Sequence, residues 1–233
     1  VCSAESTTTT STEGVGGEQG LPSFVRGIWF GRSLQLIKQV VNRDGASRRR
    51  PVTSLCCLYR QAAVLHPLVT EKVKEWALLS RGRLLVKSGD GPTAESFELW
   101  EELRKLPDEG GSSVKWPALK KKERAIEKLL RTYGGRVYML QDLVRHSLVF
   151  DKSAELLRCL VEITADPDVQ VVKAKNRLRP DYDPWKTAGY RDVHLNLLLK
   201  TPLAETLGID GHLFELQLQL VPFARCKSLG GHK

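Results

Sequence analysis

Apolar residues recur at helical spacing through the first half of the chain. The segments 34–41, 59–79 and 95–106 carry them three or four residues apart, which predicts three amphipathic helices. His66–Pro67 lies inside the second segment, where proline removes an amide donor and predicts an interruption of the helix. We therefore expect a helical accessory region over 23–110.

Two stretches of this first half lack such a pattern. Residues 1–22 are rich in Ser, Thr and Gly and hold few apolar side chains, so we expect them to be disordered. Residues 108–113 are polar and glycine-rich, which predicts a linker. The chain begins with Val1 rather than Met, as expected of a fragment or a processed product.

The pattern changes after the linker. Residues 119–133 predict a basic amphipathic helix with Leu119, Ile126, Leu129 and Leu130 available to the core, ended by Gly134–Gly135. Further elements follow in the order strand, helix, strand, strand, strand, at 141–150, 153–163, 169–176, 189–200 and 212–221. This order predicts an α+β (mixed α/β) fold for a domain at 111–233, a mixed sheet flanked by helices.

Alternation along two of the strands places polar side chains together. In 212–221, Glu215, Gln217 and Gln219 share one face, opposite an apolar face. In 189–200, the residues Tyr190, Asp192, His194 and Asn196 share a face. Such faces are either exposed to solvent or the floor of a site, and two of them together could line a cleft.

Composition and charge limit the classes of molecule that the chain is expected to bind. Apolar residues make up 41% of the chain and charged residues 27%, which is typical of a soluble globular protein, and no apolar run is long enough to span a membrane. The net charge is +9, and residues 111–150 hold nine basic and three acidic residues, an excess of six. A short basic segment suits a compact polyphosphate, although a solvated helix face would look the same.

The five cysteines suggest no metal or disulfide site. They form no CxxC pair and no Cys/His cluster with zinc-ligand spacing, so we expect a reducing compartment, either the cytoplasm or an organelle interior. Cys56 and Cys57 lie in an apolar stretch and are expected to be buried.

Phosphoryl chemistry needs carboxylates to hold Mg²⁺ and cations to neutralise phosphates. Asp142, just before an apolar run, and Glu215, on another strand, could supply the carboxylates. The candidate cations are Lys120, Lys121, Lys122, Arg124, Lys128 and Arg145.

Several motifs in one order resemble a known family. The run Ala188-Gly189-Tyr190-Arg191-Asp192-Val193-His194, then Glu215-Leu216-Gln217-Leu218, then Gly230-Gly231-His232, resembles the synthetase domain of the RelA/SpoT family. That family carries Asn-Gly-Tyr-x-Ser-Leu-His, Glu-x-Gln-Ile-Arg and Gly-x-x-x-His. Asp142-Leu143-Val144 resembles its Asp-Leu-Leu strand start, and Lys120 and Lys128 have the spacing of its two phosphate-binding lysines. The resemblance covers about 115–233. The run from Lys175-Asn176-Arg177 to Gly189-Tyr190-Arg191-Asp192 also resembles a divergent eukaryotic branch of the family.

The resemblance implies a nucleotidyltransferase-like fold that transfers pyrophosphate from ATP to the 3′-hydroxyl of GDP or GTP, producing guanosine tetra- or pentaphosphate. It implies that Asp142 and Glu215 hold Mg²⁺ and that Glu215 is the candidate base for the hydroxyl. Tyr190 would stack on guanine, and His194 would contact phosphate or ribose. The remaining substrate-binding residues that it implies are Lys120, Arg124, Lys128, Arg145 and Gln217.

Departures from the family pattern leave alternatives open. Ala188 replaces an Asn, Gln219 an Arg and Ser147 an Arg, while Arg145 stands two residues before Ser147. Asp192 replaces a Ser and adds negative charge beside a triphosphate site, unless an Arg pairs with it. One alternative function is a catalytically inactive domain that binds nucleotide or serves as an interaction module. Another is an RNA-binding domain that uses the basic segment 111–150, with RNA or the ribosome as its partner. The sequence contains no His-Asp doublet, so alarmone hydrolysis is not expected.

Overall fold

The computed structural model describes residues 20–23, 25–26, 51–87, 95–107 and 113–230. The helix expected at 34–41, most of the segment 1–22, the linker residues 108–112 and the motif residues Gly231-His232 lie outside these ranges, so the predictions made for them stay predictions.

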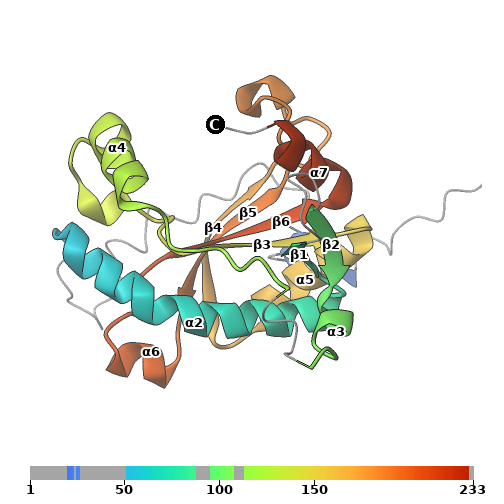
Figure 1. The fold of residues 1–233 in the computed structure, drawn as a ribbon, viewed down its shortest axis with the longest axis horizontal. Coiled ribbons are helices and arrows are strands. Elements are labelled where there is room, and N and C mark those ends of the chain that lie inside the picture. The colour runs from blue at the N-terminus through green and yellow to red at the C-terminus, as the bar shows by residue number, and fades with distance from the viewer. Residues whose placement is uncertain (1–19, 24, 27–50, 88–94, 108–112, 231–233) are drawn as a thin grey trace, which may run out of the picture.

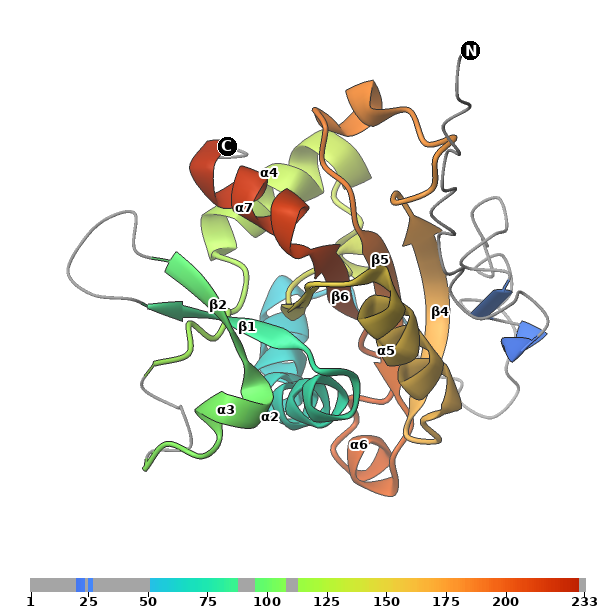
Figure 2. The same cartoon turned by 90° about the vertical axis from the view of Figure 1, so that its right-hand side faces the viewer.

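One sheet joins strands from both halves of the chain. Its order is β2-β1-β3-β6-β5-β4, with β3 and β6 parallel and the other neighbours antiparallel. Figure 2 shows β2 at one edge of the sheet and β4 at the other. The strand bounds are β1 Arg83–Lys87, β2 Glu95–Leu99, β3 Arg145–Phe150, β4 Val169–Asn176, β5 Val193–Leu199 and β6 Phe214–Leu220.

Helices α2 (Leu55–Ser80) and α5 (Ser153–Ala165) pack against each other and against the apolar face of the sheet. Phe214, Leu216 and Leu218 of β6 are fully buried on that face, as their alternation predicts. Figure 1 shows α2 running below the sheet, with α4 (Lys122–Tyr133) and α7 (Val221–Gly230) above it. The short elements are α3 Trp100–Leu103, α6 Pro202–Thr206 and the 3₁₀ helices η3 Val137–Met139 and η4 Pro184–Thr187.

The predicted fold class is confirmed. The described residues form a six-stranded mixed sheet flanked by helices, and the predicted elements at 153–163, 169–176 and 212–221 are present. Strands β3 and β5 begin four residues later than predicted, so Asp142 and Tyr190 lie in the segments that lead into them. No helix in the described ranges is long and apolar enough to span a membrane.

Two predictions for the first half were wrong. Helix α2 continues through Pro67, because Pro67 and Ala63 lie on the exposed side, where water can bind the carbonyl that loses its amide partner. Residues 95–106 form strand β2 and short α3 rather than one helix. The helical prediction did not take into account that β2 pairs with β1, and this pairing outweighs the local i, i+3 pattern.

Predictions for apolar side chains at two places were also wrong. Cys56 and Cys57 are exposed, because they lie on the outer side of the first turn of α2. In and before α4, Leu119 and Leu129 pack against the core as predicted. Ile126 and Leu130, however, are 45% and 67% exposed, and Ala125 is the buried residue of the helix. Much of the apolar stripe of α4 therefore faces outward.

Candidate functional site

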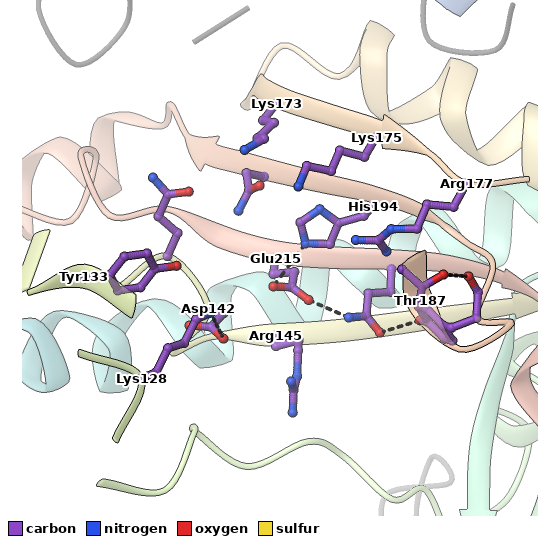
Figure 3. Close-up of a pocket in the computed structure, with 14 residues that line it drawn as sticks. Lys128, Tyr133, Asp142, Arg145, Lys173, Lys175, Arg177, Thr187, His194 and Glu215 are labelled. Atoms are coloured by element: carbon purple, nitrogen blue, oxygen red, sulfur yellow. Dashed lines mark hydrogen bonds and ion pairs between the residues drawn. The ribbon is translucent and has the colours of Figure 1, made fainter. Parts of the chain in front are cut away.

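A pocket of about 420 Å³ lies on the polar face of the sheet. Figure 3 shows cations of β4 along one side, Lys128 and Asp142 on the other, and Glu215 and His194 between them. The lining residues are Lys128, Tyr133, Gln141, Asp142, Arg145, Lys173, Lys175, Arg177, Thr187, Tyr190, His194, Asn196, Glu215 and Gln217. Five of these side chains are Lys or Arg and two are carboxylates, so the pocket is suited to an anion.

Strand register explains why these side chains meet. Paired residues of neighbouring strands point to the same face, so each set of pairs forms a row across the sheet. One row consists of Lys173, Asn196, Glu215 and Arg145. The next row, two residues along each strand, consists of Lys175, His194, Gln217 and Ser147. The four neighbouring strands β3, β6, β5 and β4 thus all contribute polar side chains to the floor of the pocket.

Asp142 lies at one end of this floor between two lysines. Its Oδ2 accepts hydrogen bonds from Lys120 Nζ at 2.5 Å and Lys128 Nζ at 2.8 Å. Burial alone would raise the pKa of Asp142, but the two ammonium groups outweigh it and hold that pKa below its usual value. The other carboxylate oxygen, Oδ1, is buried and has no hydrogen-bond partner in the protein.

Glu215 lies at the centre of the pocket in a network of polar side chains. His194 Nε2 is 3.1 Å from its Oε2, and Gln217 Nε2 donates to its Oε1 at 2.5 Å. Tyr190 Oη donates in turn to Gln217 Oε1 at 3.1 Å. Burial opposes ionisation of Glu215, but the contacts with His194 and Gln217 prevail and lower its pKa. Glu215 is therefore a carboxylate at neutral pH.

Asp192 does not add its charge to the pocket. It is fully buried, and its Oδ1 is paired with Arg177 Nη1 at 2.5 Å. The guanidinium of Arg177 also lies 5.9 Å from the ring centre of Tyr190, as a cation–π contact. Pairing with an Arg is the condition under which Asp192 is compatible with a phosphate site.

The structure brings together most of the residues that the sequence singled out. Asp142, Glu215, Lys128, Arg145, Tyr190, His194 and Gln217 all line the pocket, and Lys120 reaches it through Asp142. Arg124 is not among the lining residues. Its side chain is 68% exposed and pairs with Glu127 on the outer surface of α4.

The cations Lys173, Lys175 and Arg177 line the pocket but were not among the predicted site residues. Lys173 and Lys175 occupy alternate positions of a predicted strand, the same signal that identified Glu215 and Gln217 on β6. Arg177 directly follows that strand. Thr187, Tyr133 and Gln141 also line the pocket, but they come from the ends of η4 and α4 and from a loop, where strand alternation gives no signal.

The donor set fits Mg²⁺ better than a metal that needs a full protein cage. Within the described ranges, no three His, Cys, Asp or Glu side chains form a metal-binding group. Magnesium is usually held by one or two carboxylates, with water and substrate phosphates as its other ligands. Asp142 and Glu215 supply that number of carboxylates, and Oδ1 of Asp142 is an oxygen without a partner in the protein.

No family model and no curated protein matches this chain. Solved structures that match include the small alarmone synthetase 1 from Bacillus subtilis, alone and bound to its product pppGpp. Both are 18% identical to this chain with a TM-score of 0.39, and each alignment covers 48% of this chain and 56% of the synthetase. The type VI effector Tas1, in complex with its immunity protein, is 18% identical with a TM-score of 0.42, over 75% of this chain and 65% of Tas1.

The matched structures therefore include RelA/SpoT-type alarmone synthetases, the class that the sequence motifs resemble. The chain spans a little more than half the length of the synthetase that it matches.

Proposed function

We propose that the pocket binds ATP and a guanine nucleotide and transfers pyrophosphate from ATP to the 3′-hydroxyl of GDP or GTP. One observation carries the proposal: two ionised carboxylates, Asp142 and Glu215, line one pocket together with cations from separate elements. Lys128 comes from α4, Arg145 from β3, and Lys173 and Lys175 from β4. Cations on two sides of a carboxylate pair suit a reaction in which two phosphate-bearing substrates meet.

The balance of the reaction defines what each residue must do. The 3′-oxygen of the acceptor forms a bond to the β-phosphorus of ATP, the bond between that phosphorus and the α,β-bridging oxygen breaks, and AMP leaves. The proton of the hydroxyl passes to Glu215, which is ionised and lies at the centre of the pocket. Lys120 and Lys128 neutralise phosphates of ATP, and Tyr190 offers an aromatic ring to the guanine.

Asp142 and Glu215 are the residues that would hold Mg²⁺, which when bound neutralises charge on the transferred phosphates. The chain's own part is to position these carboxylates. Lys120 and Lys128 orient Asp142, and His194 and Gln217 orient Glu215.

A second candidate function is nucleotide binding without turnover. Its support is that Lys120 and Lys128 both bind the same oxygen of Asp142, so that this carboxylate is already neutralised. The replacements at Ala188, Ser147 and Gln219 point the same way, since each removes a polar or charged side chain of the family pattern or shortens it. This candidate predicts that nucleotides raise the melting temperature but that no product forms.

The test compares Glu215→Gln with Glu162→Gln, which removes a carboxylate from the outer surface of α5. Both variants are incubated with ATP, GDP or GTP, and Mg²⁺. We expect product from the unchanged chain and from Glu162→Gln, and at least about a hundredfold less from Glu215→Gln, because positioned acid–base groups typically contribute that much. Equal rates for the two variants would exclude Glu215 as the base. Nucleotide binding with no product in any sample would favour the second candidate.

A further inference from the structure

A second cavity, of about 550 Å³, lies outside the pocket, between the first turns of α2 and the start of α4. Its walls are mostly apolar and come from two helical faces. Leu55, Tyr59 and Ala63 are spaced four residues apart on α2, and Leu119 and Ile126 face them from the other side. We name this feature the α2–α4 groove. It explains why Ile126, in a helix with an apolar stripe, remains 45% exposed.

The shape of the groove suits a helix. Positions i, i+4 and i+8 form one continuous stripe along an α-helix, and the stripe from Leu55 to Ala63 is about 12 Å long at the helical rise. Two neighbouring helical faces with a stripe between them accept a third helix as in a small bundle. Two turns of a docked helix would fill this length.

Charge specifies the kind of helix. Both charged residues that line the groove, Arg60 and Lys122, are cations. The first turn of α2 contains no acidic side chain, so the positive end of the helix dipole adds to their field. A second copy of the chain docked through the same face would bring these cations against their own equivalents. An acidic partner satisfies them, as interfaces with complementary charge do.

We propose that the α2–α4 groove is the docking site for an acidic amphipathic helix of a partner protein. Leucine-type anchors of that helix fill the space between Tyr59 and Ile126, and its acidic flank pairs with Arg60 and Lys122. Cys56, an exposed thiol in the wall of the groove, is covered when the helix is bound.

The groove is also connected to the pocket. Tyr59 Oη donates a hydrogen bond of 2.6 Å to the backbone carbonyl of Lys120, whose ammonium group holds Asp142. A helix that presses on Tyr59 and Leu119 therefore changes the placement of Lys120. This consequence rests on the proposed function, whereas docking does not, and the measurements below test docking alone.

The probe is a synthetic 16-residue amphipathic peptide, with leucines on one face and glutamates beside them, labelled with fluorescein. A matched peptide carries lysine in place of every glutamate. Fluorescence polarisation with the full chain is expected to show saturable binding of the acidic peptide and binding at least about tenfold weaker for the basic one. In the same mixture, the acidic peptide should slow alkylation of Cys56 while leaving the neighbouring Cys57, which does not line the groove, reactive.

Two variants of α4 locate the contact. Ile126→Asp places a charge in the groove, and Leu130→Asp places the same charge on the same helix at a more exposed residue that does not line the groove. We expect Ile126→Asp to weaken binding about tenfold or more and Leu130→Asp to leave it nearly unchanged. The proposal is overturned if the acidic peptide does not bind at about 0.1 mM, if both peptides bind equally, or if the two variants behave alike. A dimer that protects Cys56 without peptide would also overturn it, in favour of a second copy as the occupant.

Discussion

At the scale of single residues, Asp142 controls the charge balance at one end of the pocket. Its Oδ2 lies within 2.8 Å of both Lys120 Nζ and Lys128 Nζ, so the carboxylate keeps two ammonium groups close together. Asp142 is therefore a structural ion pair as well as the metal ligand that we propose. These two roles can be separated by measuring stability as well as activity.

We predict that Asp142→Asn lowers the free energy of unfolding by about 1–3 kcal/mol at pH 7, because two lysines then face each other without the anion. Since folding lowers the pKa of Asp142, its contribution is complete above the usual value near 3.8 and is lost as pH falls through the folded value. The difference between the variant and the unchanged chain should therefore shrink in acid. Urea unfolding at pH 7 and pH 3 measures this difference in the free energy of unfolding.

The control for this prediction is Asp181→Asn, whose carboxylate is 63% exposed and whose replacement should change the free energy of unfolding little. An unchanged stability of Asp142→Asn at pH 7 would contradict this account.

His146 predicts a second acid effect on the opposite face of β3. It is buried beside His66, with ring centres 5.1 Å apart. Burial, and to a lesser extent the charge of His66, lowers the pKa of His146 from 6.5 to about 3. The unfolded chain then binds this proton first, so stability should fall as pH drops from about 6.5 toward 3, by about 1.4 kcal/mol per pH unit. His146→Phe should make the free energy of unfolding less dependent on pH between pH 6 and 4, by the contribution of one proton. Buried His212, with a pKa of about 4, still contributes to the pH dependence in the variant. An identical slope in the variant would contradict the prediction.

At the scale of elements, edge strand β4 gives the pocket its second set of cations. Burial lowers the pKa of Lys173, and the positive charge of Lys175 lowers it further. The two ammonium groups therefore repel each other when no anion lies between them. A bound phosphate would relieve that repulsion. This is a reason to propose that Lys173 and Lys175 bind an anion, while Ala174 and Val172 on the same strand are buried.

We predict that Lys175→Met weakens binding of GTP about tenfold, with a smaller effect at high salt, because a charge contact of this kind is screened by ions. Lys200→Met, just beyond the end of β5 on an exposed position, is the matched control and should bind as the unchanged chain does. Calorimetric titration at two salt concentrations gives both affinities. Equal losses for the two variants would mean that net charge alone, and not the row on β4, attracts the nucleotide.

The junction between α2 and β1 is tightly packed. A Cβ at Gly82 would lie 2.9 Å from the backbone Cα of Ala77. We predict that Gly82→Ala destabilises the fold by about 1–3 kcal/mol, since the backbone of α2 must shift to admit the methyl group. Gly211→Ala, where a Cβ would meet no atom within 4 Å, is the control for thermal unfolding. Equal melting temperatures for the two variants would show that the junction is looser than described.

Elements were predictable from sequence where local pattern and tertiary packing agree. Strand β6 alternates between buried leucines and polar pocket residues, and α5 buries one continuous stripe, so each pattern has one reading. The segment 95–106 fits two patterns, because Phe97, Trp100 and Leu103 form a helical stripe although Phe97 lies in β2 and the other two lie in α3. The pairing of β2 with β1 decides the outcome for 95–99. The site shows the same limit of local patterns. Only strand alternation indicated that Lys173 faces the pocket, whereas Arg124 belongs to the basic segment and yet faces solvent.

At the scale of the whole molecule, one core and one sheet run through the described part of the chain. Buried residues of α2, such as Trp76, belong to the same cluster as Leu216 of β6. Arg83 of β1 holds Asp151, just after β3, through two hydrogen bonds of 2.8 and 2.6 Å. The pocket and the α2–α4 groove therefore lie on one body, and Lys120, next to Leu119 of the groove, contacts Asp142 of the pocket. A nonlocal arrangement of this kind cannot be derived from patterns within single segments.

The most direct test of the proposed reaction is the fate of label in the β-phosphate of ATP. The chain is incubated with β-labelled ATP, Mg²⁺ and GDP or GTP, and the products are separated. Pyrophosphate transfer predicts that the β-label moves to the guanosine product and that unlabelled AMP appears in equal amount. Label that remains in ADP, with or without a phosphorylated guanosine, or label that remains entirely in ATP while both nucleotides bind, would contradict the proposal.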